Sequence, residues 1–193
     1  MIFVLLGIAS AVLFTVGDIP YFLDTLKGRT KPHRVTWGMV VLLNAIGFAN
    51  QYASGATNSL WLFGAGVIVT GAIFLASLKN GVGGESKMDI ACLVISIIGV
   101  ILWATLKSPA YSIIASAITD LVILVPTYRK TIKHPETETK ISWLIGTISV
   151  GMATVSVGRL DWRLLILPLW SFILQLYMIY LLYLRPKAVT AKS

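Results

Sequence analysis

An internal repeat without gaps constrains this chain more than any other feature of its sequence. The segment Ile-Ala-Ser-Ala at residues 8–11 recurs at residues 114–117, an offset of 106 positions (114 − 8). Nine positions between 8 and 37 are identical at that offset: Ile8, Ala9, Ser10, Ala11, Val16, Pro20, Thr25, Lys27 and Trp37. A repeat of this length describes architecture. The sequence therefore predicts two copies of one structural unit and a segment that connects them.

Composition places both copies in a membrane. Of the 193 residues, 56% are hydrophobic and 12% are charged, whereas a soluble domain has about 25% charged residues. The mean hydropathy is +0.83. The apolar runs are about 20 residues long, which is the length of a membrane-spanning helix, and they lack the alternation of barrel strands. We therefore predict an all-α polytopic membrane protein, with residues 1–22 as a retained first span and not a signal peptide.

The apolar runs predict seven transmembrane helices, at about 2–25, 35–53, 58–78, 88–106, 109–130, 141–158 and 162–184. Residues 1–78 form the first three-helix repeat and residues 109–184 the second. Residues 79–108 contain a flexible glycine-rich linker and a single extra helix, and residues 185–193 form a basic tail. Because each copy has an odd number of spans, the extra helix makes the two three-helix bundles parallel, in a 3+1+3 layout.

Lysine and arginine predict the orientation. With the N-terminus outside, 13 of the 16 Lys and Arg residues fall on the cytoplasmic side. Three are left outside: Lys107, Arg159 and Arg163. Positive charge gathers on the cytoplasmic side of membrane proteins, so we expect a multi-pass protein of the cell (inner) membrane with a cytoplasmic C-terminus. The net charge of +8 is then a topology signal that needs no nucleic acid as a partner.

Two aspartates lie inside predicted spans. Asp120 is near the middle of its helix and Asp18 is in the inner half of the first helix, although an aspartate at the centre of a span costs about 2.5–3.5 kcal/mol on insertion scales. Asp120 corresponds through the repeat to Phe14, four residues before Asp18. Residues four apart share a helix face. We therefore expect both carboxylates to point toward the shared axis, about 6 Å apart in depth. There they bind substrate or a proton, or they are protonated and hydrogen-bond to a neighbouring hydroxyl or tryptophan as packing residues; for Asp18 both interpretations stay open.

Three further pairs are candidates for roles in the same region. Pro20 and Pro126 occupy equivalent positions, and we interpret them as hinges rather than as fixed bends. Trp37 and Trp143 begin two helices directly after basic loops, and we favour membrane-interface aromatics over pocket residues. Asn44 and Gln175 are polar residues at mid-depth. They line a pocket or join helices by hydrogen bonds, and the sequence leaves both interpretations open.

No metal, cofactor or catalytic site is expected. Cys92 is the only cysteine, so an intrachain disulfide is excluded. His33 and His134 lie in loops, where we expect no carboxylate beside them and therefore no metal site. Nucleophile–base triads and phosphate-binding motifs are absent from the sequence, which favours a protein that is not an enzyme.

The chain resembles the PQ-loop and SWEET superfamily of small transporters. The resemblance rests on the 3+1+3 layout and on a proline, a basic loop and a tryptophan in each copy, at Pro20 and Trp37 and at Pro126 and Trp143. Tyr21 and Thr127 stand where the family has glutamine. The resemblance implies two three-helix bundles that rock about a substrate site at mid-membrane. The same fold also serves the KDEL receptor, which retrieves proteins.

Two functions follow as expectations. The first is transport of a small polar solute by alternating access, with or without coupling to protons. The second is a receptor or assembly module that does not transport and whose basic loops hold an acidic peptide or a lipid headgroup. The expected partners are the solute and the lipid bilayer, and both a monomer and a homo-oligomer are compatible with the sequence.

Overall fold

The computed structural model describes residues 1–53, 55–105 and 109–185, and within these ranges the chain forms seven α-helices and no β-strand. The predicted all-α class is confirmed. The turn at residues 107–108 and the tail at 186–193 lie outside the described residues. The helices are α1 (Ile2–Leu26), α2 (Arg34–Ala53), α3 (Leu60–Asn80), α4 (Lys87–Thr105), α5 (Pro109–Lys133), α6 (Lys140–Ser156) and α7 (Trp162–Ile179), with a 3-10 turn at Pro135–Thr137 and a π-helical turn at Tyr180–Leu184 that continues α7.

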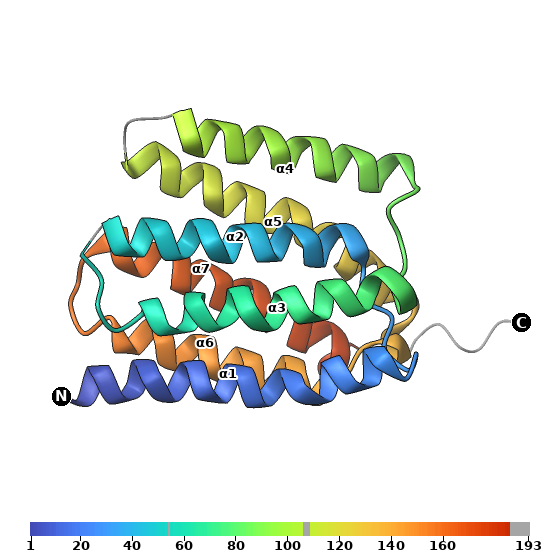
Figure 1. Cartoon of the computed structure of the whole chain (residues 1–193), viewed down its shortest axis with the longest axis horizontal. Coiled ribbons are helices and arrows are strands. Elements are labelled where there is room, and N and C mark those ends of the chain that lie inside the picture. The colour runs from blue at the N-terminus through green and yellow to red at the C-terminus, as the bar shows by residue number, and fades with distance from the viewer. Residues whose placement is uncertain (54, 106–108, 186–193) are drawn as a thin grey trace, which may run out of the picture.

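Successive helices run in opposite directions, so α1 and α5 point the same way (Figure 1). We call α1–α3 the N-half and α5–α7 the C-half. Helix α3 packs against α1 and α2, and α7 packs against α5 and α6. The halves meet where α1 packs on α6 and α2 on α5, while α4 lies mainly on α5. The main helix contacts within the N-half thus recur between the equivalent helices of the C-half, and the two main contacts between the halves are equivalent to each other.

Within the part of the chain that the structure describes, three helical segments are long and apolar enough to cross a membrane, and they suggest a membrane protein. They are Ile2–Leu26, Leu60–Asn80 and Trp162–Leu184, of 25, 21 and 23 residues. On α1, Val12 and Val16 are more than half exposed, whereas Ser10 and Asp18 are buried. Apolar side chains outside and polar side chains inside reverse the pattern of a soluble helix, and they match a helix with lipid on its outer face.

Small residues on α1 let α6 approach closely. A Cβ atom placed on Gly17 would lie 2.8 Å from Cβ of Ile145 on α6, and the Ser149 hydroxyl donates to the Ser10 carbonyl at 2.6 Å across the same interface. The equivalent contact between α2 and α5 is less extensive. One side of the junction between the halves is therefore packed tightly and the other more openly.

The linker between α3 and α4 is docked onto the loop before α2, which corrects the expectation of a flexible segment. The Val82 amide donates to the Pro32 carbonyl and the Arg34 amide donates to the Val82 carbonyl, both at 2.9 Å. His33 is buried, with Nε2 3.2 Å from Oδ1 of Asp89. The expectation that no carboxylate accompanies the histidines is therefore wrong. The docked linker brings the first turn of α4 to His33, and Nδ1 of His134 lies 3.3 Å from Oε1 of Glu136.

Substituting Gly17 with alanine should destabilise the protein by about 1–3 kcal/mol, because the added methyl group overpacks the junction with Ile145. Gly71→Ala is the matched control, since a Cβ atom there meets nothing within 4 Å and alanine is the better helix former. Thermal unfolding in detergent measures both variants. Equal melting temperatures for the two would contradict a close α1–α6 contact.

Lowering the pH from about 7.5 to about 5.5 should destabilise the protein through His33. Burial lowers the pKa of His33 below its ordinary value of 6.5. The unfolded chain then binds this proton more readily than the folded chain, so the free energy of unfolding falls as the pH drops through about 6.5 and below. His33→Asn should flatten the dependence of the melting temperature on pH. His134→Asn, at an exposed position, should leave it as in the unmodified protein; an unchanged slope in His33→Asn would refute the assignment.

Candidate functional site

A cavity lies between the two halves and is lined by residues of every helix except α4. It leaves about 150 Å³ for the centres of water-sized molecules, room for roughly ten waters. All six candidates named for binding or as aromatics line it: Asp18, Asp120, Asn44, Gln175, Trp37 and Trp143. The other polar side chains of the lining are Tyr21, Thr36, Thr70, Ser116, Thr127, Ser142 and Ser171.

The ionisable side chains of the described lining are acidic. Asp18 and Asp120 line the cavity, and the described lining contains no lysine, arginine or histidine. Oδ2 of Asp120 accepts a hydrogen bond from the Ser171 hydroxyl at 3.1 Å. Asp18 is only 7% exposed, and no hydrogen bond to its carboxylate is formed by the residues that the structure describes. Of the two carboxylates, Asp120 thus has a hydrogen-bond donor among the described residues and Asp18 has none.

Helix α5 presents a polar stripe to the cavity that the sequence analysis missed. Ser116 and Thr127 line the cavity on either side of Asp120. Both hydroxyls are buried without a hydrogen-bond partner among the described residues. Their spacing of four and seven residues from Asp120 places all three on one helix face. That spacing was the available signal, and these hydroxyls add hydrogen-bonding capacity beside the carboxylate.

The two amide side chains line the cavity and also contact a neighbouring helix of their own half. Nδ2 of Asn44 donates to the Val40 carbonyl at 3.0 Å and lies 3.4 Å from the Thr70 hydroxyl on α3. The Thr147 hydroxyl on α6 lies 3.4 Å from Oε1 of Gln175 on α7. Asn44 and Gln175 therefore line a pocket and also lie within hydrogen-bonding distance of a neighbouring helix, which combines the two interpretations that the sequence left open.

Aromatic rings pack together at the end of the cavity next to the loops at residues 27–33 and 134–139, which we call the basic end. The ring centroids of Tyr21 and Trp37 are 4.9 Å apart, and that of Trp143 lies 6.5 and 6.4 Å from them. Trp37 is 7% exposed, so the membrane-interface interpretation is wrong for it: its face of α2 turns inward onto α1 and α6. We call these three residues the aromatic cluster.

A buried ion pair supports the aromatic cluster from the basic end. Nε1 of Trp143 donates to Oε2 of Glu138 at 2.8 Å, and Glu138 pairs with Lys130. The Glu138 side chain is completely buried. Lys130 also donates to the Lys31 carbonyl at 2.6 Å. The ion pair of Glu138 and Lys130 thus connects Trp143 of the aromatic cluster with Lys31 in the first basic loop, and so connects the two halves.

Hydroxyls reach across the junction to the backbone beside each helix proline. Proline lacks an N–H group and disturbs the carbonyls one turn before it. The Tyr21 amide, directly after Pro20, donates to the Ser142 hydroxyl at 3.2 Å. The Thr36 hydroxyl donates to the Ile123 carbonyl, three residues before Pro126, at 2.7 Å. Thr36 and Ser142 are themselves equivalent in the repeat, so each half supplies one such hydroxyl to the other.

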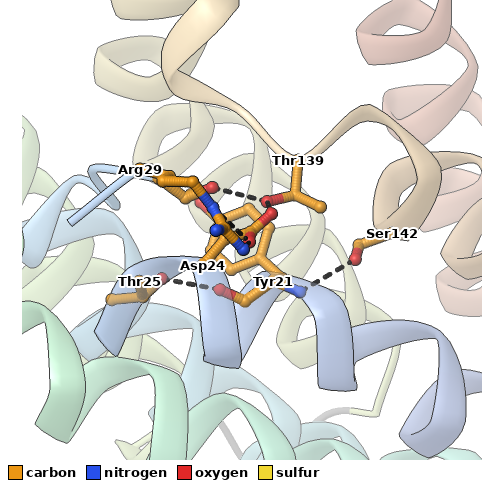
Figure 2. A network of polar contacts seen from close by, with 7 residues as sticks. Tyr21, Asp24, Thr25, Arg29, Thr139 and Ser142 are labelled. Carbon is orange, nitrogen blue, oxygen red and sulfur yellow. Dashed lines mark hydrogen bonds and ion pairs between the residues drawn. The ribbon is translucent and has the colours of Figure 1, made fainter. Parts of the chain in front are cut away.

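Further hydrogen bonds join the two halves at the basic end. Figure 2 shows Asp24 of α1 between Arg29, with which it forms an ion pair, and the Thr139 hydroxyl, which donates to its carboxylate at 3.0 Å. Thr30 and Thr139 share a hydrogen bond of 2.5 Å. The Lys31 amide donates to the Thr137 carbonyl at 3.1 Å. Together with the aromatic cluster, these contacts join the two halves at this end of the cavity.

Comparisons of the chain with protein-family models, with curated proteins and with solved structures found no match. Within the described ranges, no three His, Cys, Asp or Glu side chains gather in a way that could hold a metal ion. The site is therefore characterised by its own geometry: an acidic, partly aromatic cavity between two halves that share a repeat.

Ser142→Ala and Thr36→Val should each lower the free energy of unfolding by about 1–2 kcal/mol, because each removes a buried hydrogen bond between the halves. Thr15→Val is the control. Its hydroxyl is exposed and bonds only to the Ala11 carbonyl of its own helix, so its melting temperature should stay close to that of the unmodified protein. Chemical or thermal unfolding in detergent distinguishes these outcomes, and a loss as large in Thr15→Val would contradict the assignment.

Proposed function

We propose that the chain is a membrane transporter that carries a small polar solute through the cavity by alternating access. The observation that carries the proposal is the position of the cavity, between two halves related by an internal repeat and lined by helices of both. A site at such a junction becomes accessible from either side when one half rocks against the other. The resemblance to PQ-loop and SWEET transporters supports the same function.

In the proposed membrane arrangement all seven helices cross the bilayer, and the two three-helix units are parallel. The N-terminus is outside and the basic end faces the cytoplasm, in the cell (inner) membrane. The charge asymmetry of 13 Lys and Arg residues against three supports this orientation. The common direction of α1 and α5 in Figure 1 supports the parallel arrangement.

In the proposed cycle, the aromatic cluster and the contacts at the basic end form the inner gate. Pro20 and Pro126 are the hinges, because each interrupts its helix close to this gate without ending it. Opening the gate requires the Thr36 and Ser142 hydroxyls to leave the backbone groups of the opposite half. Asp120 then holds a proton or a cationic group of the solute, while Asp18 lies beside the path to the cytoplasm.

Two basic side chains of the basic loops are engaged within the protein, which favours a gate over a receptor surface at these positions. A receptor of acidic peptides needs basic side chains free to bind. Lys130 is engaged with Glu138, and Arg29 is engaged with Asp24. The backbone of Lys31 bonds to both Lys130 and Thr137. These loops bind one another, which suits a gate.

A disulfide across the gate tests alternating access. Thr30→Cys with Thr139→Cys, in a chain with Cys92→Ser, places two thiols where the native hydroxyls are 2.5 Å apart. Uptake of labelled sugars, amino acids, nucleosides and amines into proteoliposomes should identify a transported solute. Oxidation should then abolish its flux, and reduction should restore it.

The control is Thr30→Cys alone, oxidised in the same way, which should keep its flux. A cross-linked protein that transports as fast as the reduced protein would refute a gate at the basic end. Absence of flux for every solute tested, together with stable capture of an acidic peptide, would favour the receptor function.

A further inference from the structure

We propose that the solute of this cavity is a small amine that carries no carboxylate, held with its ammonium group at Asp18 and Asp120. The inference rests on the proposed function for its biological meaning, since it names the class of molecule that the transporter would carry. It depends on three properties of the cavity: its charge, its unsatisfied acceptors and its aromatic wall.

Charge separates amines from other small solutes. The described lining contains two carboxylates and no cationic side chain. In a medium of low dielectric constant an added carboxylate is repelled by both of these groups, and it finds no positive partner. A neutral sugar leaves both negative charges uncompensated. An ammonium group compensates one of them, and a diamine compensates both.

The hydrogen-bonding groups of the cavity also favour an ammonium group. Asp18 receives no hydrogen bond from the described residues, and an ionised carboxylate can only accept. The hydroxyl oxygens of Ser116 and Thr127 are also unpartnered there and can accept. An ammonium group has three donors and no acceptor. These two hydroxyls can also donate, but the carboxylate cannot, so an ammonium group finds acceptors at all three side chains.

The aromatic wall and the volume limit the solute further. Tyr21, Trp37 and Trp143 line the cavity together with Phe14, and the faces of such rings attract ammonium groups. With space for roughly ten waters, the cavity accommodates a short aliphatic amine or diamine. The carbon chain of such a molecule can pack on the apolar residues of the lining, among them Leu124 and Leu174.

The test is equilibrium binding to the full chain in nanodiscs of neutral phosphatidylcholine, measured by calorimetry near pH 7.5. The decisive pair of probes is 1,5-diaminopentane and L-lysine, which differ only by the α-carboxylate. We expect 1,5-diaminopentane to bind at least about tenfold more tightly than lysine. We expect glucose to give no measurable heat of binding.

Isosteric variants assign the binding to the cavity. Asp18→Asn and Asp120→Asn should each weaken the binding of 1,5-diaminopentane by about tenfold or more, because each removes a charge-assisted hydrogen bond. Asp161→Asn is the matched control. That aspartate lies outside the cavity and pairs with Arg163, so the affinity should be unchanged.

Three results would overturn the inference: lysine or glucose binding as tightly as 1,5-diaminopentane, no binding of 1,5-diaminopentane, or full affinity in both cavity variants. Because binding is measured without flux, the outcome is separate from that of the transport proposal. Amine binding without any uptake would refute transport and leave this inference standing. Uptake of glucose by a protein that does not bind 1,5-diaminopentane would support transport and refute the inference that the solute is an amine.

Discussion

A buried backbone group that loses its hydrogen-bond partner must find another, because an unpaired buried polar group is costly. Prolines at equivalent points of α1 and α5 disturb such groups in both halves. The protein meets this requirement from outside each helix, through Ser142 at the Tyr21 amide and Thr36 at the Ile123 carbonyl. Each half therefore completes the backbone of the other, and the relative position of the halves is tied to the local geometry at the prolines.

The junction is otherwise unequal on its two sides. Helix α1 lies close to α6 because Gly17 leaves room for Ile145, whereas the contact between α2 and α5 is less extensive. Ser10 and Ser116 illustrate the result. They are equivalent in the repeat, yet the Ser10 carbonyl is bonded to α6 whereas the Ser116 hydroxyl lines the cavity. Close packing on one side and a looser contact on the other leave space inside the protein without opening it at the basic end.

Much of this structure could be predicted from the sequence, because long apolar runs and a repeat are strong signals. The seven helices follow from those runs. Helix α5 extends beyond its predicted end to Lys133, and the predicted end of α7 is a π-helical turn. The position of Asp18 and Asp120 on one cavity could be inferred because the repeat relates their helix faces. Helical periodicity alone then placed both carboxylates toward the axis, and both line the cavity.

Other features depend on contacts between segments distant in sequence, which periodicity does not report. The inward orientation of Trp37 depends on how α2 is rotated against α1 and α6. The pairing of His33 with Asp89 depends on docking of the glycine-rich linker, whose composition indicated flexibility. Ser116 and Thr127 were missed because a serine or threonine within a helix usually bonds to its own backbone, and only the packed structure shows that these two do not.

The acidic groups of the cavity break the symmetry of the repeat that encloses it. Asp120 corresponds to Phe14 in the other copy, and Asp18 corresponds to Leu124. A molecule inside would therefore meet a different surface after a half-turn about the axis that relates the copies. The duplication supplies two similar walls, and the divergence at these positions makes the two walls chemically different.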